Sequence, residues 1–212
     1  MSQEEGFQAE LAAKKIDADK MAALIAADQS LIDRVFQELS NKSPRVKFGC
    51  SKALLLLSER RPELLYPKID EIFKLLGRDN QIIKWSAIAI LGNLAAVDRD
   101  HRIKGVLRTI CGFLCAGELI TANHAITALG KIARAFPEER AGVTARLLGI
   151  EQAVFNTDEC RNIAIGKSIL AMEMYVDPAH IRKDVLQFAR SQTSNTRRAT
   201  ATKAKAFLRK CQ

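Results

Sequence analysis

Five cysteines are the residues in this 212-residue sequence whose chemistry can be judged most directly from spacing. Cys111 and Cys115 lie one helical turn apart, so they could bind a metal ion if further ligands were near. No histidine and no second cysteine pair is nearby in the sequence. An odd number of cysteines without paired spacing is also a poor disulfide framework. We therefore expect no metal, and we interpret Cys50 and Cys160 as small residues packed inside helices.

Catalysis has little support in the remaining residues. The sequence contains no glycine-rich loop that would cradle a phosphate and no nucleophile with a readable base. The adjacent acids Glu4-Glu5 and Glu138-Glu139 are placed at expected helix starts, where the helix dipole favours negative charge. We therefore expect a protein that is not an enzyme, with no cofactor and no small-molecule substrate.

Positive charge gathers at the end of the chain. The net charge is +9, and residues 179–212 hold nine basic residues against one acidic residue, which places +8 of it there. Such a cluster attracts phosphate backbones, anionic membranes or acidic proteins; the competing interpretation is a solvated cap helix that serves solubility. If the cluster binds nucleic acid, the residues expected to do so are Arg190, Arg197, Arg198, Lys203, Lys205, Arg209 and Lys210.

Composition favours a folded, non-membrane chain. Hydrophobic residues make up 48 % of the sequence, and only 6 % is aromatic, which argues for helices packed through small residues. No apolar run approaches the roughly 20 residues that span a bilayer. The first residues are acidic where a secretory signal would be basic and then apolar. These features predict a cytoplasmic location.

A helical pattern repeats along the chain at a period of about 38 residues. In the stretch 79–98, Ile83, Ala87, Ile90, Leu91 and Leu94 recur at helical spacing. The segment Leu-Gly-Asn-Leu-Ala at 91–95 is followed by Leu-Gly-Lys-Ile-Ala at 129–133, which is 38 positions later. A helix that repeats at this period, with another helix in each gap, indicates an α-solenoid.

Turn residues divide the chain into a cap and five helix pairs. Residues 1–27 are predicted to form an N-terminal helical cap with a polar outer face, and residues 28–212 a single repeat domain that ends in the basic repeat 179–212. Gly, Asn, Asp, Ser and Pro mark the helix starts and stops. The expected pairs are 29–39 with 46–59, 62–76 with 79–98, 101–115 with 121–136, 138–155 with 160–175, and 177–194 with 196–210. No segment alternates as a strand does, so the predicted fold class is all-α.

These turns resemble those of HEAT repeats. A turn with Asp, Asn or Pro is followed by an apolar and a basic residue, then by Ala and Leu-Gly at helical spacing, as in Ser-Pro-Arg-Val-Lys at 43–47 and Asp-Asn-Gln-Ile-Ile-Lys at 79–84. The resemblance covers roughly residues 28–212 and is weaker in the fourth and fifth pairs. It implies a right-handed α-solenoid, and because HEAT proteins mostly bind other macromolecules, it implies a macromolecular partner without specifying which.

Enzymes built on HEAT-like folds fit the sequence less well. The iron-dependent hydroxylases of this kind need His-Glu pairs, and none of His101, His124 or His180 is followed by Glu. HEAT-like DNA glycosylases are similar in size and basic charge but are rich in tryptophan, whereas Trp85 is the single one here.

The second helix of each pair resembles the inner, concave wall of such a solenoid. If Ile83, Ala87, Ile90 and Leu94 face the partner helix, Trp85, Ala89, Gly92 and Ala96 point away from it. The residues at equivalent positions are Phe48, Lys52, Leu55 and Glu59 in the first pair. They are Asn123, Thr127, Gly130 and Arg134 in the third pair, and Asn162, Gly166, Ile169 and Glu173 in the fourth. Two aromatics beside two amides could hold a peptide. The alternative is that the aromatics pack sideways against neighbouring helices. The expected partner-binding residues are Phe48, Lys52, Trp85, Asn123, Arg134 and Asn162.

Two further sets of residues recur at one position of successive repeats, and each set has a structural and a functional interpretation. Lys47, Lys84 and Arg161 form either a ladder of intramolecular ion pairs with turn acids such as Asp79 or Asp158, or a stripe for an acidic partner. Glycine inside a helix costs about 1 kcal/mol relative to alanine. Gly92 and Gly130 therefore mark a backbone that is approached closely, either by a neighbouring helix or by a ligand.

The sequence thus predicts a non-enzymatic HEAT-repeat scaffold that binds a protein or peptide on its concave face. The alternative function is nucleic-acid binding through the basic C-terminal repeat.

Overall fold

The computed structural model describes residues 2–177 and 182–211, and every described element is a helix or a 3₁₀ turn. Helices account for 79 % of the chain, which confirms the all-α prediction. None of the described helices is long and apolar enough to cross a membrane. The chain divides into two compact units, unit 1 (Met1–Asp100) and unit 2 (His101–Gln212).

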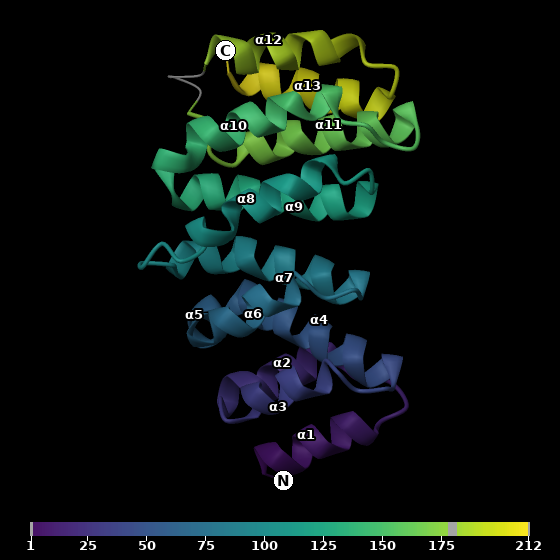
Figure 1. The fold of residues 1–212 in the computed structure, drawn as a ribbon, viewed down its shortest axis with the longest axis vertical. Coiled ribbons are helices and arrows are strands. Elements are labelled where there is room, and N and C mark those ends of the chain that lie inside the picture. Colours follow the sequence, from purple (N-terminus) through teal and green to yellow (C-terminus); the bar gives the residue numbers. More distant parts are fainter. Residues whose placement is uncertain (1, 178–181, 212) are drawn as a thin grey trace. The chain divides into compact units, whose positions relative to one another are not determined.

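Unit 1 contains seven helices among its described residues. They are α1 (Gln3–Ala12), α2 (Ala18–Ala27), α3 (Leu31–Glu38), α4 (Pro44–Arg60), α5 (Pro62–Leu65), α6 (Ile69–Leu75) and α7 (Gln81–Leu94). Helix α4 packs between α2 and α7, while α3 covers α4, and α5 with α6 covers α7 (Figure 1). We call α2, α4 and α7 the second helices of unit 1. Helix α2, which lies within the predicted cap, therefore packs as a second helix does.

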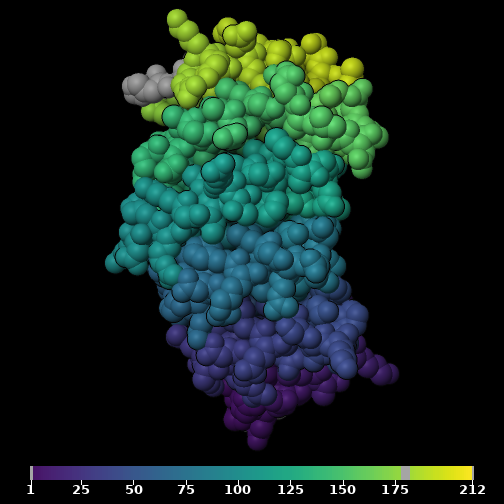
Figure 2. Space-filling model, viewed as in Figure 1, coloured from purple at the N-terminus to yellow at the C-terminus, as the bar shows by residue number. Residues whose placement is uncertain are grey.

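Unit 2 has the same two layers. Its described helices are α8 (Lys104–Gly112), α9 (Leu119–Ala135), α10 (Arg140–Leu148), α11 (Asp158–Glu173), α12 (Lys183–Ser191) and α13 (Arg198–Lys210). The second helices α9, α11 and α13 lie side by side, and α8, α10 and α12 cover them on one face (Figure 1). On the face shown in Figure 2, the side chains of neighbouring helices within each unit meet without open gaps.

Helix ends occur at the predicted turn residues. Pro44 opens α4 from the first turn, where its missing N–H costs nothing. Asn80 caps α7, because its side-chain oxygen accepts a hydrogen bond from the Ile83 N–H at 3.2 Å. Thr157 caps α11 by accepting from the Cys160 N–H at 3.1 Å. Gly117 takes a left-handed φ of 77° in the turn before α9, a conformation that glycine adopts without strain.

Several predicted helices are shorter than expected. The segment 62–76, predicted as one helix, is divided into α5, the 3₁₀ turn Tyr66–Lys68 and α6. Pro67 lies at this break, since a proline ring clashes with the preceding helical turn and removes a hydrogen bond. The helix predicted from residue 138 becomes a 3₁₀ turn, Pro137–Glu139, followed by α10 and the 3₁₀ turn Gly149–Gln152. Further 3₁₀ turns are Ala95–Val97, Phe113–Cys115 and Gln192–Ser194.

The predicted domain boundaries stay predictions. The boundary after residue 27 falls between α2 and α3. The basic repeat 179–212 is described only for residues 182–211, and the expected helix start at Pro178 and the residue His180 lie outside the described residues.

Glycine lets consecutive second helices touch. An alanine Cβ at Gly130 of α9 would lie 2.9 Å from the Ala171 carbonyl oxygen and 3.0 Å from the Ala171 Cβ of α11. A neighbouring helix is therefore what approaches this backbone, as one of the two interpretations of Gly130 expected. Gly92 is buried as well.

We predict opposite effects for two glycine-to-alanine changes in unit 2. Gly130→Ala should lower the free energy of unfolding by about 1–3 kcal/mol, because the methyl group meets a backbone carbonyl that cannot move aside. Gly142→Ala in α10 should raise it by about 0.5–1 kcal/mol, because nothing lies within 4 Å of that position. Urea unfolding followed by circular dichroism measures both. Equal effects would show that the contact at Gly130 is not tight.

Candidate functional site

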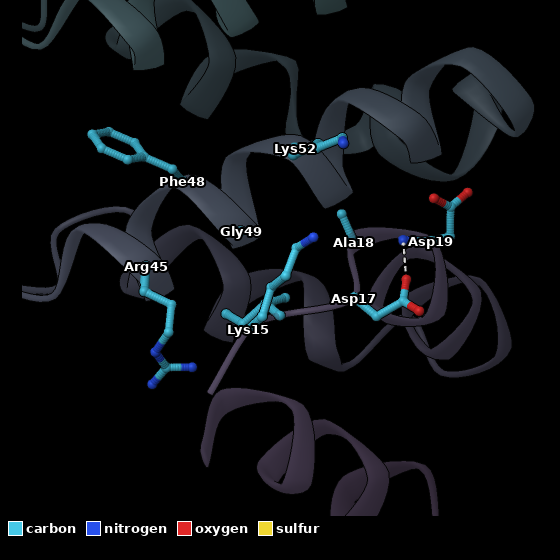
Figure 3. A pocket seen from close by; sticks show the side chains of 9 residues that line it. Lys15, Asp17, Ala18, Asp19, Arg45, Phe48, Gly49 and Lys52 are labelled. Carbon is cyan, nitrogen blue, oxygen red and sulfur yellow. Dashed lines mark hydrogen bonds between the residues drawn. The ribbon is translucent and has the colours of Figure 1, made fainter. Parts of the chain in front are cut away.

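In unit 1, Phe48 and Lys52 on α4 line a pocket of about 570 Å³ (Figure 3). The lysine is exposed and the phenylalanine is half-buried. Other lining residues, Lys15 and Asp17, come from the linker between α1 and α2. Trp85, the other predicted aromatic of this unit, is half-buried on α7. The two aromatics thus combine packing with partial exposure, which is intermediate between the two sequence interpretations.

The pocket exists because the α1–α2 linker lies directly on α4. A Cβ at Gly49 would meet the Ile16 side chain at 2.8 Å, so glycine is what admits the linker at this point. Arg45 of α4 fixes the other end of the linker by donating hydrogen bonds to the carbonyl oxygens of Leu11, at 2.8 Å, and Ala13. The α1–α2 linker and α4 therefore both line the pocket.

The charges of this pocket that lack a partner are positive. Asp17 is occupied as the cap of α2, where its carboxylate accepts from the N–H groups of Asp19 and Lys20. The carboxylate of Asp19 forms an ion pair with Arg60. Neither Lys15 nor Lys52 forms an ion pair within the described residues, and Lys15 extends toward the side of α4 that carries Lys52 (Figure 3). The pocket is thus lined by two ammonium groups and by Phe48, whose ring points away from them (Figure 3).

In unit 2, the predicted residues Asn123 and Arg134 lie on the uncovered side of α9. Arg134 is exposed, and Asn123 is half-buried. The Oδ1 atom of Asn123 is buried without a hydrogen-bond partner in the described structure. Ile120, on the same side of the helix, is 52 % exposed, which is unusual for so large an apolar residue. This part of α9 thus has a buried acceptor without a partner close to an exposed cation and exposed apolar surface.

Asn162, the matching residue of α11, is already engaged by the next helix pair. Its amide donates to Thr196 Oγ1 at 3.0 Å and accepts from Asn195 Nδ2 at 2.9 Å. The other α11 residues expected on the concave wall are not free either. Ile169 is fully buried, and Glu173 forms an ion pair with Lys210 of α13. These residues of α11 therefore do not form an open concave wall as expected, because they are buried or engaged by the next helix. The role of Asn162 in partner binding stays a prediction.

Gly166, also expected to face outward, is buried against α13. A Cβ there would meet Thr200 Oγ1 at 2.6 Å. The reason for the difference is register, because this side of α11 faces α13 rather than the uncovered face. The uncovered stripe of α11 begins one residue later and consists of Ile163, Lys167, Leu170 and Met174 at spacings of four, three and four.

The predicted ion-pair ladder is present only in part. Arg161 pairs with Asp158 inside α11, and Arg197 pairs with Glu159 at 2.7 Å across two helices. Lys47 and Lys84 of unit 1 form no ion pair within the described residues. The structural interpretation therefore holds at Arg161, while the two lysines remain available to a partner.

The basic C-terminal cluster separates into three groups. Arg197 and Lys210 are neutralised by Glu159 and Glu173 of α11. Arg198, Lys205 and Arg209 are exposed and share one face of α13, since their spacings are seven and four residues; we call them the terminal face. Lys203 lies on a different side of α13, and Arg190 is exposed on α12. The seven residues predicted to bind nucleic acid therefore do not share one surface.

The cysteines are free thiols in the structure. Cys111 and Cys115 line a separate groove of about 540 Å³ between α8 and α10, together with Arg108 and Arg146. No group of three or more His, Cys, Asp or Glu side chains suited to a metal ion is found among residues 2–177 and 182–211. Cys50 is fully buried, as its predicted packing role requires, and burial raises its pKa to about 12.

Comparison with known proteins identifies the class of fold. A designed armadillo repeat protein, YIII(Dq)4CqI, is 16 % identical, with a TM-score of 0.61 and complete coverage of both chains. A second designed armadillo repeat protein, solved in complex with the peptide (KR)4, is 15 % identical, with a TM-score of 0.62 and the same coverage. An engineered protein is 18 % identical, with a TM-score of 0.62 over 99 % of this chain and 91 % of its own.

The fold is therefore that of an armadillo/HEAT-like repeat solenoid, which confirms the predicted fold class. At these identities the likeness concerns the fold alone. No family model matches the sequence, and no curated protein matches it significantly.

Sequence reasoning missed Lys15 and Lys167, and it named Lys203 only as a nucleic-acid-binding residue. Lys15 lies in a linker inside residues 1–27, which the sequence predicts to form a cap. A signal for Lys167 was present, because Leu-Gly-Lys at 129–131 returns as Ile-Gly-Lys at 165–167. When the repeats are aligned on their turns, Asn123 matches Asn162 instead, and the match between Lys131 and Lys167 is not visible.

Two asparagine variants test which amide is available to a partner. Asn162→Ala should lower the free energy of unfolding by about 1 kcal/mol, because it removes hydrogen bonds to the terminal repeat. Asn123→Ala should be neutral or slightly stabilising, because it removes a buried oxygen that has no partner. Thermal and urea unfolding measure both. Equal losses would mean that Asn123 has a structural role as well.

Cysteine reactivity should follow burial. At pH 8 and under native conditions, iodoacetamide should modify exposed Cys115 readily and leave Cys50 unmodified, because only the thiolate reacts and the Cys50 pKa is about 12. Peptide mass spectrometry reads the sites, with urea-unfolded protein as the control in which every cysteine reacts. Rapid native labelling of Cys50 would contradict its place in the core.

Proposed function

We propose that this protein is a non-enzymatic repeat scaffold that binds an extended peptide segment of a partner protein along the uncovered sides of its second helices. This proposal rests mainly on the Asn123 amide on the uncovered side of α9. Its Oδ1 atom is buried and has no hydrogen-bond partner in the described structure. A buried acceptor without a hydrogen bond costs free energy, which a peptide N–H would recover once the half-buried side chain turns its oxygen outward.

Further features of the same surfaces support a peptide partner. In unit 1, the half-buried Phe48 and the unpaired ammonium groups of Lys15 and Lys52 line the same pocket. Half-buried aromatics can anchor a ligand with little loss of conformational entropy. One structure with the same fold is a designed protein in complex with a peptide, so this architecture is compatible with peptide binding.

A cytoplasmic location is part of this proposal. The five cysteines are free, and a reducing compartment keeps thiols in that state.

Nucleic-acid binding is the alternative function. The observation in its favour is the terminal face, where Arg198, Lys205 and Arg209 line up without carboxylate partners in the described residues. The comparisons lend it no support, and Arg197 and Lys210 are neutralised within the protein. We therefore treat it as an outcome of the binding experiment.

Fluorescence polarisation with labelled 20-residue peptides tests the proposal. A panel of acidic, basic and uncharged sequences, each mixed with apolar residues, should contain a ligand with a Kd of about 1–100 µM. The double variant Asn123→Ala, Arg134→Ala should weaken that binding about tenfold, because it removes two polar groups from the uncovered side of α9. Arg108→Ala with Arg146→Ala, on the covering helices of unit 2, is the matched control and should leave the affinity unchanged.

Two results would contradict peptide binding. One is the absence of a ligand in the whole panel, and the other is an affinity that the double variant does not change. A labelled DNA duplex belongs in the same experiment. Salt-sensitive duplex binding that is lost on charge reversal at Arg198 and Lys205, without any peptide binding, would favour the alternative.

A further inference from the structure

Two lysines of unit 2 are brought together by the contact between α11 and α13. The Cδ atom of Lys203 lies 3.4 Å from the position that a Cβ would take at Gly166. The aliphatic stem of Lys203 therefore crosses α11 at the residue directly before Lys167. Because glycine leaves no side chain in between, cations from two different helices share one small region, which we call the cationic pair.

Positive charges act on one another around the cationic pair. Burial, together with the positive charges of Arg197 and Lys167, lowers the pKa of Lys203. Burial and the charge of Lys167 also lower the pKa of His124 on α9. Lys167 is thus close enough to act on a titratable group of each neighbouring second helix.

The nearest carboxylates of α11 have other partners. Glu159, at the start of the helix, pairs with Arg197 at 2.7 Å, and Glu173, at its end, pairs with Lys210. Lys167 and Lys203 form no ion pair within the described residues. The α11–α13 contact therefore has compensated charge at both ends and uncompensated positive charge in the middle.

Apolar side chains flank the cationic pair. Ile163, Leu170 and Met174 share the uncovered stripe of α11 with Lys167, and all are partly exposed. On α9, Ile120 is 52 % exposed, and Arg134 adds another cation. The uncovered side of unit 2 thus alternates apolar contacts with positive charge.

We propose that the cationic pair, Lys167 and Lys203, binds carboxylates of an acidic peptide segment whose apolar side chains pack on Ile163 and Leu170. This inference rests on the proposed function and specifies the chemistry of the partner. Complementary charge selects such a segment over a basic one, because like charges placed together at an interface disfavour binding.

An acidic peptide fits this surface better than nucleic acid does. Exposed isoleucine and leucine offer binding energy to apolar side chains but none to a phosphate backbone. Single-stranded nucleic acid would require aromatic platforms for its bases, and the stripe of α11 has aliphatic residues instead. The cations arranged for a duplex, Arg198, Lys205 and Arg209, lie on the terminal face.

The test compares the acidic peptide EELEELEE with the basic peptide KKLKKLKK by fluorescence polarisation on the full chain. The acidic peptide should bind at least about tenfold more tightly at low salt and weaken as salt rises. The variant Lys167→Glu, Lys203→Glu should lose about tenfold or more for the acidic peptide and gain for the basic one. Lys205→Glu with Arg209→Glu makes the same change of net charge on the terminal face and should leave the acidic peptide bound.

Each failure has its own signature. Preferential binding of the basic peptide, or acidic-peptide binding that the Lys167→Glu, Lys203→Glu variant does not change, overturns the cationic pair but leaves peptide binding in place. Equal loss in both charge-reversal variants overturns it too, because the attraction would then be general. Failure of every peptide to bind removes the proposed function as well. Lys167→Gln with Lys203→Gln, checked by circular dichroism, shows that a loss does not come from unfolding.

Discussion

The structure depends on the close approach of consecutive second helices. Glycine makes this approach possible at Gly130 against Ala171 and at Gly166 against Thr200. Each glycine gives up roughly 1 kcal/mol of helix propensity, and the contact between helices offsets it. In unit 1 the same device admits the α1–α2 linker, since Gly49 leaves room for Ile16. Small residues therefore decide which backbone segments can touch.

This close contact also determines which polar groups remain available. Where α11 meets α13, Asn162, Glu159 and Glu173 all find partners on the neighbouring chain segment. Lys167 directly follows Gly166 and lies on another side of α11. It has no carboxylate partner in the described structure. A rotation of about 100° per residue thus separates groups that hold the repeat together from groups that can meet a ligand.

The fold and the binding surface are specified by different residues. Designed armadillo repeat proteins reach TM-scores of 0.61 and 0.62 with this chain at 15–16 % identity. A solenoid of this kind therefore needs the spacing of apolar and small residues, such as Ala87, Leu91 and Leu129, more than it needs particular sequences. Function depends instead on side chains that packing does not constrain, and for this reason the shared fold leaves the partner open.

The sequence by itself determined the helices, their turns and the two layers. These features depend on local periodicity, on caps such as Asn80 and Thr157, and on Pro44, all of which are visible within a few residues. Only the tertiary structure decided which side of each helix stays uncovered. Phe48, Lys52, Asn123 and Arg134 remain accessible at least in part, whereas Asn162 is engaged by its neighbour. The cationic pair joins residues 36 positions apart in the sequence, so its existence depends on the register between two helices, and no local pattern encodes that register.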